Sequence, residues 1–169
     1  MEKTHLSKKI IQKLRNSINW GALPLDSLTN YCKRALQKDG WTITHDPYKI
    51  PLENRTLKAD LGAEKIIAAE RGLEKIVVEV KSFLRDSFIY DFHEAFGQYL
   101  VYRRFIDVKE PQRIIYMAVP EQVFIDEFID PDVIFLCKMD KIKLIVFNPL
   151  NEEIVEWKEH WRKSKNTKK

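Results

Sequence analysis

The spacing of hydrophobic and polar residues changes several times along the chain, and each change predicts a new element. Apolar residues recur at helical spacing over residues 4–18 and 26–38, and Gly40 stands where the second of these helices is expected to end. Lysines lie between the apolar positions of the first segment, which is typical of a basic amphipathic helix. Residues 41–45 then alternate in polarity up to Asp46-Pro47, which predicts a strand followed by a turn.

The middle of the chain predicts further strands and then one long helix. A turn at Arg71-Gly72 separates the last two strands, and helical spacing begins at residue 86 and continues to 107. An aromatic stripe along this helix is typical of core side chains, and a base-stacking platform is the alternative interpretation. The strands are expected at residues 57–61, 65–69 and 75–81, and the stripe consists of Phe88, Phe92, Phe96 and Tyr99.

The last third of the chain completes a mixed pattern. A strand is expected at 113–119, helices at 120–128 and 132–139, and a hairpin of 141–147 with 153–157 over Asn148-Pro149. The order predicts the α+β class, with a central mixed sheet flanked by helices. We expect one domain over residues 25–161, a basic amphipathic extension over 1–24 and a basic tail over 162–169.

The charge is divided unevenly between the ends and the body. The 169 residues carry a net charge of +4, of which residues 1–19 contribute +4 and residues 162–169 contribute +5, so residues 20–161 carry −5. Basic ends supply nonspecific attraction to phosphates, but an acidic body is weak support for a nucleic-acid groove. It suits a protein partner, or a cleft that needs a cation before it meets DNA.

Several classes of protein and site are excluded or disfavoured. No apolar run approaches the roughly 20 residues of a bilayer span, so no membrane is expected as a partner. The first residues lack the pattern of a secretory signal, and the cytoplasm is the expected compartment. Cys32 and Cys137 lie far apart and suggest neither a disulfide framework nor a zinc site, so both are expected to be buried apolar residues. The four histidines also lack zinc spacing.

Candidate chemistry begins on the strand at 75–81. Glu79 and Lys81 are two residues apart in an otherwise apolar strand, so both side chains point to one face. Charges on such a strand cost desolvation free energy unless they are compensated, and an internal ion pair is the alternative to a functional site. A second Glu-x-Lys, Glu156 and Lys158, lies in the terminal hairpin, so the motif alone is a weak signal.

Two further groups of residues complete the candidate site. Asp60 lies in an expected strand, and pairing of that strand with the next ones could bring two carboxylates together as ligands for Mg²⁺ or Mn²⁺. A divalent ion would stabilise phosphoryl charge and acidify a bound water, beside which Lys81 could act, so these parts match metal-assisted phosphodiester hydrolysis. On the long helix Glu94, Gln98 and Tyr102 form one polar stripe, for which a solvated edge is the alternative interpretation.

These residues, in this order, resemble the PD-(D/E)xK restriction-endonuclease-like superfamily. More closely, the chain resembles the XisH family, the fdxN-element excision controlling factors of cyanobacteria. The resemblance covers about residues 28–158 and departs from the superfamily pattern at Ala59, where a proline is usual. The blocks that carry it are Lys38–Pro47, Asp60–Lys65, Ala68–Glu70, Glu79–Phe83, Gly97–Tyr99 and Leu144–Pro149.

The resemblance implies a restriction-endonuclease-like fold, a role in excising a DNA element during heterocyst differentiation, and a small companion protein, XisI. In that framework Asp60, Glu79 and Lys81 are the catalytic residues, and Gln98, Tyr102 and Glu94 bind nucleic acid or support the site. Asp60 and Glu79 are the expected ligands of a Mg²⁺ or Mn²⁺ cofactor. Glu64 and Glu70 are alternative ligands. If the turn lies at Arg71–Glu74, simple hairpin pairing places Glu64 opposite Lys81, and the position of Asp60 then depends on a bend near Gly62.

Two functions fit these residues and the resemblance. The first is a Mg²⁺-dependent DNA endonuclease, and the second is a noncatalytic regulatory module that binds an XisI-type partner or a recombinase. Whether the chain is an enzyme is left undecided by its residues. Residues 1–24 could cover an apolar face, mediate dimerisation or bind phosphates. The second of these roles would make the protein a homodimer.

Overall fold

A computed structural model describes residues 25–51, 56–57, 66–83 and 87–161. Its helices are α2 (Leu25–Lys38), α3 (Phe88–Lys109), α4 (Glu121–Glu127) and α5 (Pro131–Met139). Its strands are β1 (Thr42–His45), β2 (Ile50–Pro51), β3 (Thr56–Leu57), β4 (Ile66–Arg71), β5 (Glu74–Val80), β6 (Arg113–Pro120), β7 (Leu144–Asn148) and β8 (Glu153–Lys158). The helix expected at 4–18 and most of the strand expected at 57–61 lie outside these residues.

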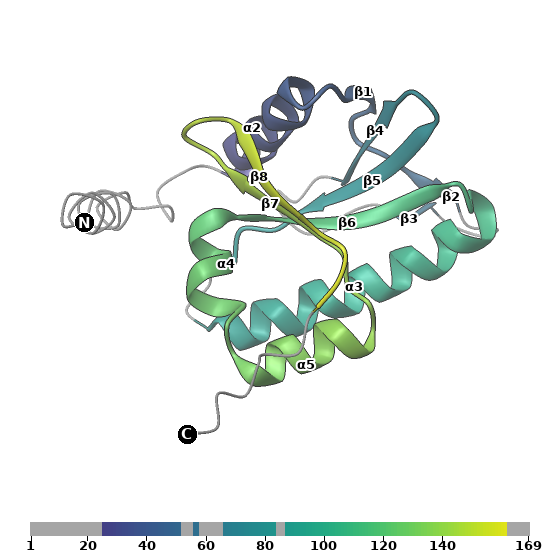
Figure 1. Ribbon diagram of the computed structural model, residues 1–169. Helices are drawn as coiled ribbons and strands as arrows, with labels where there is room; N and C mark the ends of the chain where they lie inside the picture. Colours follow the sequence, from purple (N-terminus) through teal and green to yellow (C-terminus); the bar gives the residue numbers. More distant parts are fainter. Residues whose placement is uncertain (1–24, 52–55, 58–65, 84–86, 162–169) are drawn as a thin grey trace.

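Six strands form one mixed sheet in the order β1-β4-β5-β6-β7-β8 (Figure 1). The central strands β5, β6 and β7 are parallel, while β1, β4 and β8 pair with their neighbours in the antiparallel sense. Strands β2 and β3 form a separate two-stranded ribbon. The parallel centre requires long crossover connections, and α3 supplies the one between β5 and β6.

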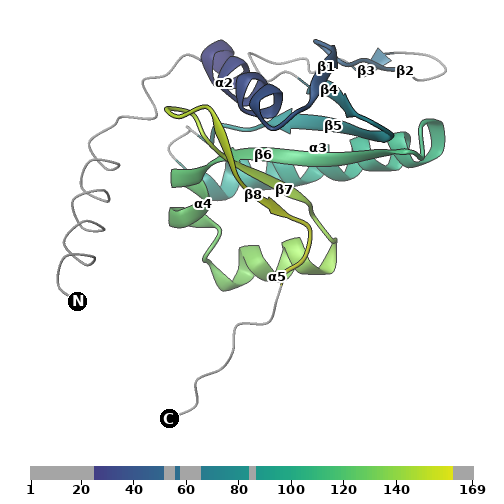
Figure 2. The same cartoon turned by 45° about the horizontal axis from the view of Figure 1, so that its top comes forward.

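Helices cover both faces of this sheet. Helix α2 lies on one face and α3 with α5 on the other, as Figures 1 and 2 show from two directions. Each face has its own apolar core, which alternating side chains of the same strands supply: Ile76, Val78 and Val80 pack toward α2, and Val77 packs toward α3. The predicted α+β class with a mixed sheet between helices is therefore confirmed.

Local sequence signals explain where several elements begin and turn. The β4–β5 hairpin closes with Arg71 opposite Glu74, and Gly72 occupies the left-handed region at φ +59°. Helix α5 begins after Asp130, whose carboxylate accepts hydrogen bonds from the backbone N–H of Asp132 and Val133. The turn at Arg71-Gly72 was predicted from the sequence, whereas the cap at Asp130 was not.

Side chains whose role was open are mostly part of the core. Cys32 and Cys137 are buried and free, as expected. The aromatic stripe of α3 packs against the sheet and α4, with Phe88, Phe92 and Phe128 in mutual ring contact. The core interpretation of the stripe is therefore confirmed. Within the part of the chain that the structure describes, no helix combines the length and the apolar character needed to cross a bilayer.

Candidate functional site

Strand β5 delivers two charged side chains to the α3 face of the sheet. Glu79 is the penultimate residue of β5 and Lys81 follows its last residue. Side chains alternate along a strand, so both share the face of Val77, which belongs to the core beneath α3. The backbone N–H of Lys81 donates to the carbonyl of Ala118 at 2.9 Å, which extends the pairing with β6 and fixes the lysine.

The two side chains meet each other and a glutamine of α3. The Nζ of Lys81 lies 3.1 Å from Oε1 of Glu79 and donates to Oε1 of Gln98 at 2.5 Å. The Nε2 of Gln98 in turn lies 3.4 Å from Oε1 of Glu94, one turn earlier on the helix. The structure thus brings together four of the predicted site residues in one polar chain that links β5 to α3.

Burial distinguishes this pair from the other Glu-x-Lys segment. The side chain of Glu79 is 3% exposed and that of Lys81 is 4% exposed. In the terminal hairpin Glu156 is 44% exposed and Lys158 is 21% exposed, although their 3.2 Å separation is nearly the same. Two charges withdrawn from water carry a desolvation cost of several kcal/mol that an exposed pair does not. Only the pair on β5 therefore has the low-dielectric setting in which charges act strongly on a ligand.

The other predicted site residues are distributed differently. Asp60 and Glu64 lie outside the described residues. Tyr102 is buried in the core beneath α3, one turn after Gln98. Glu70 pairs with Lys75, four residues before Glu79, so about 3.3 Å per residue places it roughly 13 Å along the strand. The structure does not bring Glu70 to Glu79.

The donors at Glu79 suit a hard divalent cation. Mg²⁺ prefers carboxylate oxygens and usually takes only one or two from a protein, retaining several waters. Glu79 and, farther along the polar chain, Glu94 supply such oxygens. Among the described residues no three His, Cys, Asp or Glu side chains form a group able to hold a metal. Of the predicted ligands, Glu79 and Glu70 are among the described residues, and Glu79 is the one that lies beside Lys81.

A second polar network lies at the opposite end of β4 and β6 and was not expected from the sequence. Tyr48 donates to Glu110, and the guanidinium of Arg113 reaches Oε2 of Glu110 at 2.5 Å and Oε1 of Glu70 at 3.1 Å. Burial and the adjacent Glu110 raise the pKa of Tyr48 to about 12. Burial alone would raise the pKa of Glu110, but the hydrogen bonds from Tyr48 and Arg113 outweigh it and lower that pKa.

The family model described as XisH protein matches residues 24–155 of the sequence. The chain belongs to the XisH family. The membership inferred from motifs is therefore confirmed, and the match includes β5, α3 and every described residue of the candidate site.

Two solved XisH-type structures are similar to this chain over most of its length. One is an XisH family protein from Nostoc punctiforme PCC 73102, with 38% identity and a TM-score of 0.71. The other is an fdxN element excision controlling factor protein from Anabaena variabilis, with 38% identity and a TM-score of 0.72. Each comparison covers 78% of this chain and 98% of the solved one. No curated protein is significantly similar to the sequence.

Proposed function

We propose that this XisH-family chain is a metal-dependent DNA-processing protein with a PD-(D/E)xK-type site that hydrolyses phosphodiester bonds during excision of a DNA element. The observation that carries the proposal is the buried contact between Glu79 and Lys81, 3.1 Å apart at the end of β5, with Gln98 of α3 on the same ammonium. The name of the Anabaena variabilis relative, an fdxN element excision controlling factor, supports the biological role.

Each described residue has a distinct task in this proposal. Glu79 holds the cation together with Asp60, which the superfamily pattern assigns as the second carboxylate. Lys81 aligns the attacking water and offsets negative charge on the phosphoryl oxygens. Gln98 accepts from Lys81 and holds its ammonium in place, and Glu94 orients the amide of Gln98. When bound, Mg²⁺ or Mn²⁺ would stabilise phosphoryl charge and lower the pKa of a water ligand.

Cleavage by matched variants tests the proposal. We expect the full chain to cut duplex DNA with Mg²⁺ or Mn²⁺, alone or with an XisI-type partner, and Glu79→Gln to lose at least a hundredfold of that rate. Glu156→Gln, which makes the same change in the exposed Glu-x-Lys pair, should cut like wild type. Gel electrophoresis of a labelled duplex measures the rate, and circular dichroism checks that both variants are folded.

The result that would contradict the proposal is equally specific. If wild type and both variants show the same rate, or if a folded Glu79→Gln cuts as fast as wild type, Glu79 is not part of a hydrolytic site. Titration calorimetry with Mn²⁺ provides an independent readout, because Glu79→Gln should bind the ion more weakly than Glu156→Gln.

A regulatory role is the second candidate, and two observations favour it. The side chains of Glu79 and Lys81 are almost completely enclosed, which also suits a structural ion pair. Residues 20–161 carry a net charge of −5, which favours a protein surface over DNA. This role predicts an XisI-type complex that assembles without metal and survives Glu79→Gln, as measured by gel filtration in EDTA. A complex that requires both Mg²⁺ and DNA would contradict it.

A further inference from the structure

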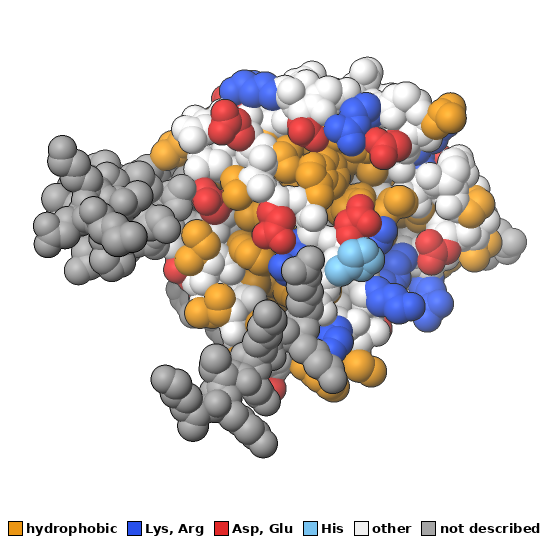
Figure 3. Space-filling model, in the orientation of Figure 1, with side chains coloured by type: hydrophobic (Ala, Val, Ile, Leu, Met, Phe, Trp, Pro, Cys, Tyr) orange, Lys and Arg blue, Asp and Glu red, His pale blue; other side chains and the backbone are white. Residues whose placement is uncertain are grey.

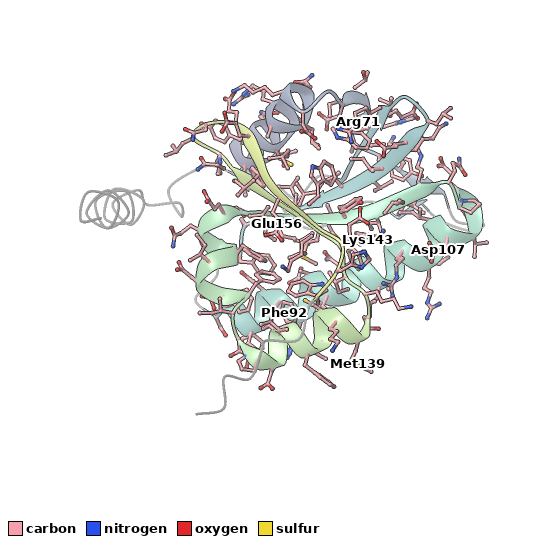
Figure 4. All side chains as sticks on the ribbon, in the orientation of Figure 1. Arg71, Phe92, Asp107, Met139, Lys143 and Glu156 are labelled. Carbon is pink, nitrogen blue, oxygen red and sulfur yellow. The ribbon has the colours of Figure 1, made fainter. Side chains whose placement is uncertain are left out.

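A basic pocket lies on α3 away from Glu79 and Lys81. It has a volume of about 560 Å³ and is bounded by the C-terminal half of α3, the start of β6 and the connection from α5 to β7. We name it the α3–β7 pocket. Its charged rim consists of Arg103, Arg104, Arg113, Lys141 and Lys143 against Asp107 and Asp140. Figure 4 labels Asp107, Lys143 and Met139 around it.

The pocket is separate from the candidate site both around the axis of α3 and along the strands of the sheet. Tyr99, Arg103 and Asp107 follow one another at helical spacing and form a different stripe of α3 from Glu94 and Gln98. Ile115 and Lys143 lie at the amino ends of β6 and β7, whereas Glu79 lies at the carboxyl end of β5. Because these three strands are parallel, the two sites occupy opposite ends of the sheet.

The cations of the rim are held so that their charge remains available. Arg103 donates from Nη1 to the backbone carbonyl of Asp140, and its guanidinium lies 5.6 Å from the ring centre of Tyr99. These contacts are neutral, so they position the arginine without cancelling its charge. Arg104 and Lys141 are exposed. Lys143 and Arg113 are the exceptions. The Nζ of Lys143 lies 3.6 Å from Oε2 of Glu159, and the guanidinium of Arg113 is paired with Glu110 and Glu70.

The positive rim also contrasts with its surroundings. The body of the protein, residues 20–161, carries a net charge of −5, yet five cations and two carboxylates meet at this pocket. Two of the cations are paired with carboxylates outside the lining. Figure 3 shows Lys and Arg side chains gathered over the C-terminal half of α3. A local positive field on an acidic body directs an anionic ligand to one place.

We infer that the α3–β7 pocket binds the phosphodiester backbone of duplex DNA. Arginine forks and lysines on an open rim suit phosphate oxygens, and they come from separate segments, as a contact with an extended polyanion requires. Tyr99, the aromatic residue of the lining, is buried and offers no face to a base, so the contact is independent of sequence. The inference goes beyond the proposed function because it needs neither a metal ion nor Glu79.

The salt dependence of DNA binding tests it. Fluorescence anisotropy of a labelled duplex is measured with the full chain in EDTA at several salt concentrations. In a plot of the logarithm of the DNA association constant against the logarithm of the salt concentration, each lost phosphate contact reduces the magnitude of the slope by about 0.9. We therefore expect the slope for Arg104→Gln/Lys141→Gln to be smaller than that of wild type by about two. Arg104→Lys/Lys141→Arg should retain the wild-type slope.

The matched control removes two cations from the other face of the sheet. Arg34 and Lys38 of α2 both contact Glu152, so Arg34→Gln/Lys38→Gln changes the net charge equally while leaving the pocket intact. It should bind DNA with the wild-type slope. Equal slopes for wild type and Arg104→Gln/Lys141→Gln, an equal loss in both double variants, or no binding by wild type in EDTA would overturn the inference.

Free phosphate provides the remaining distinction. If inorganic phosphate, titrated by calorimetry, binds through Arg104 and Lys141 while the duplex does not bind, the pocket takes small phosphates and the DNA assignment is wrong. The outcome is also distinguishable from that of the proposed function. A protein that never cuts DNA, yet shows the expected difference in slope, contradicts only the hydrolytic site.

Discussion

Lys81 and Lys158 each lie close to a glutamate two residues earlier, but their surroundings differ. The ammonium of Lys81 is enclosed with Glu79 and Gln98, whereas Lys158 lies over the rings of Phe124 and Trp161 at the surface. Removing one member of a buried pair leaves the other charge in a poorly solvated place. Removing one member of an exposed pair lets water replace it.

We predict different stability losses for the two alanine variants. Lys81→Ala should lower the free energy of unfolding by about 3–5 kcal/mol, because the Glu79 carboxylate loses its cation in a buried setting. Lys158→Ala should cost about 1 kcal/mol or less, including its contacts with aromatic rings. Urea denaturation measures both. Similar losses would show that the β5 pair is not desolvated as the structure indicates.

The sequence predicted this site only in part. Some of its geometry is fixed by spacing within one element, and the rest by contacts between distant segments of the chain. A period of two places Glu79 and Lys81 on one face wherever the strand lies. The spacing of Glu94 and Gln98 likewise places them together on any helix. That Lys81 meets Gln98 depends on how α3 packs on β5, which no local pattern specifies.

Helix α3 is the element that connects both sites. One flank carries Gln98 at the buried pair, and another carries Arg103 at the α3–β7 pocket. Its outer surface exposes Tyr90 and Val108, so apolar side chains lie on the solvent side of this helix as well as on its buried side. Gly97 lies on that surface, and an added Cβ would meet nothing within 4 Å. Close packing among the described residues therefore does not require a glycine at this position.

Gly97→Ala should stabilise the protein. Glycine in a helix interior costs about 1 kcal/mol relative to alanine, and no described atom opposes the added methyl group. We expect the free energy of unfolding to rise by up to this amount, measured by urea denaturation with an unchanged slope. Gly72→Ala is the contrasting change, because its φ of +59° makes alanine strained and the variant less stable. A loss of stability in Gly97→Ala would contradict the open space.

The elements themselves followed closely from the sequence. The described helices and the strands of the main sheet begin and end within three residues of the predicted boundaries in most cases, because each has a clear period or a cap. The two-residue strand β2 was missed. A segment this short carries no period and is a strand only because β3 pairs with it.

The polar network of Tyr48, Glu110, Arg113 and Glu70 ties distant parts of the fold together. It joins the segment before β2 to the α3–β6 connection and to β4. Its hydrogen bonds lower the pKa of Glu110, so the folded state releases this proton more readily than the unfolded chain. The resulting stabilisation is complete above the ordinary glutamate pKa and is lost as the pH falls through the lowered one.

Acid denaturation should therefore depend on Glu110. We expect wild type to lose stability more steeply than Glu110→Gln as the pH falls below about 4.5, the ordinary value, because glutamine has no proton to gain. Glu153→Gln, at an exposed position of β8, should follow wild type. Urea denaturation at a series of pH values measures the slopes. Parallel curves for wild type and Glu110→Gln would contradict the lowered pKa.

The residue pattern was sufficient for the order of elements, the mixed sheet between helices and the common face of Glu79 and Lys81, because periodicity, caps and turns act over a few residues. Tertiary structure decided which Glu-x-Lys pair is buried, which helix residue the lysine contacts, and that Arg103 meets Lys143 at one pocket. These contacts join segments far apart in the chain. They depend on how the helices pack on the sheet, and that packing is set by the summed burial of both cores rather than by any local motif.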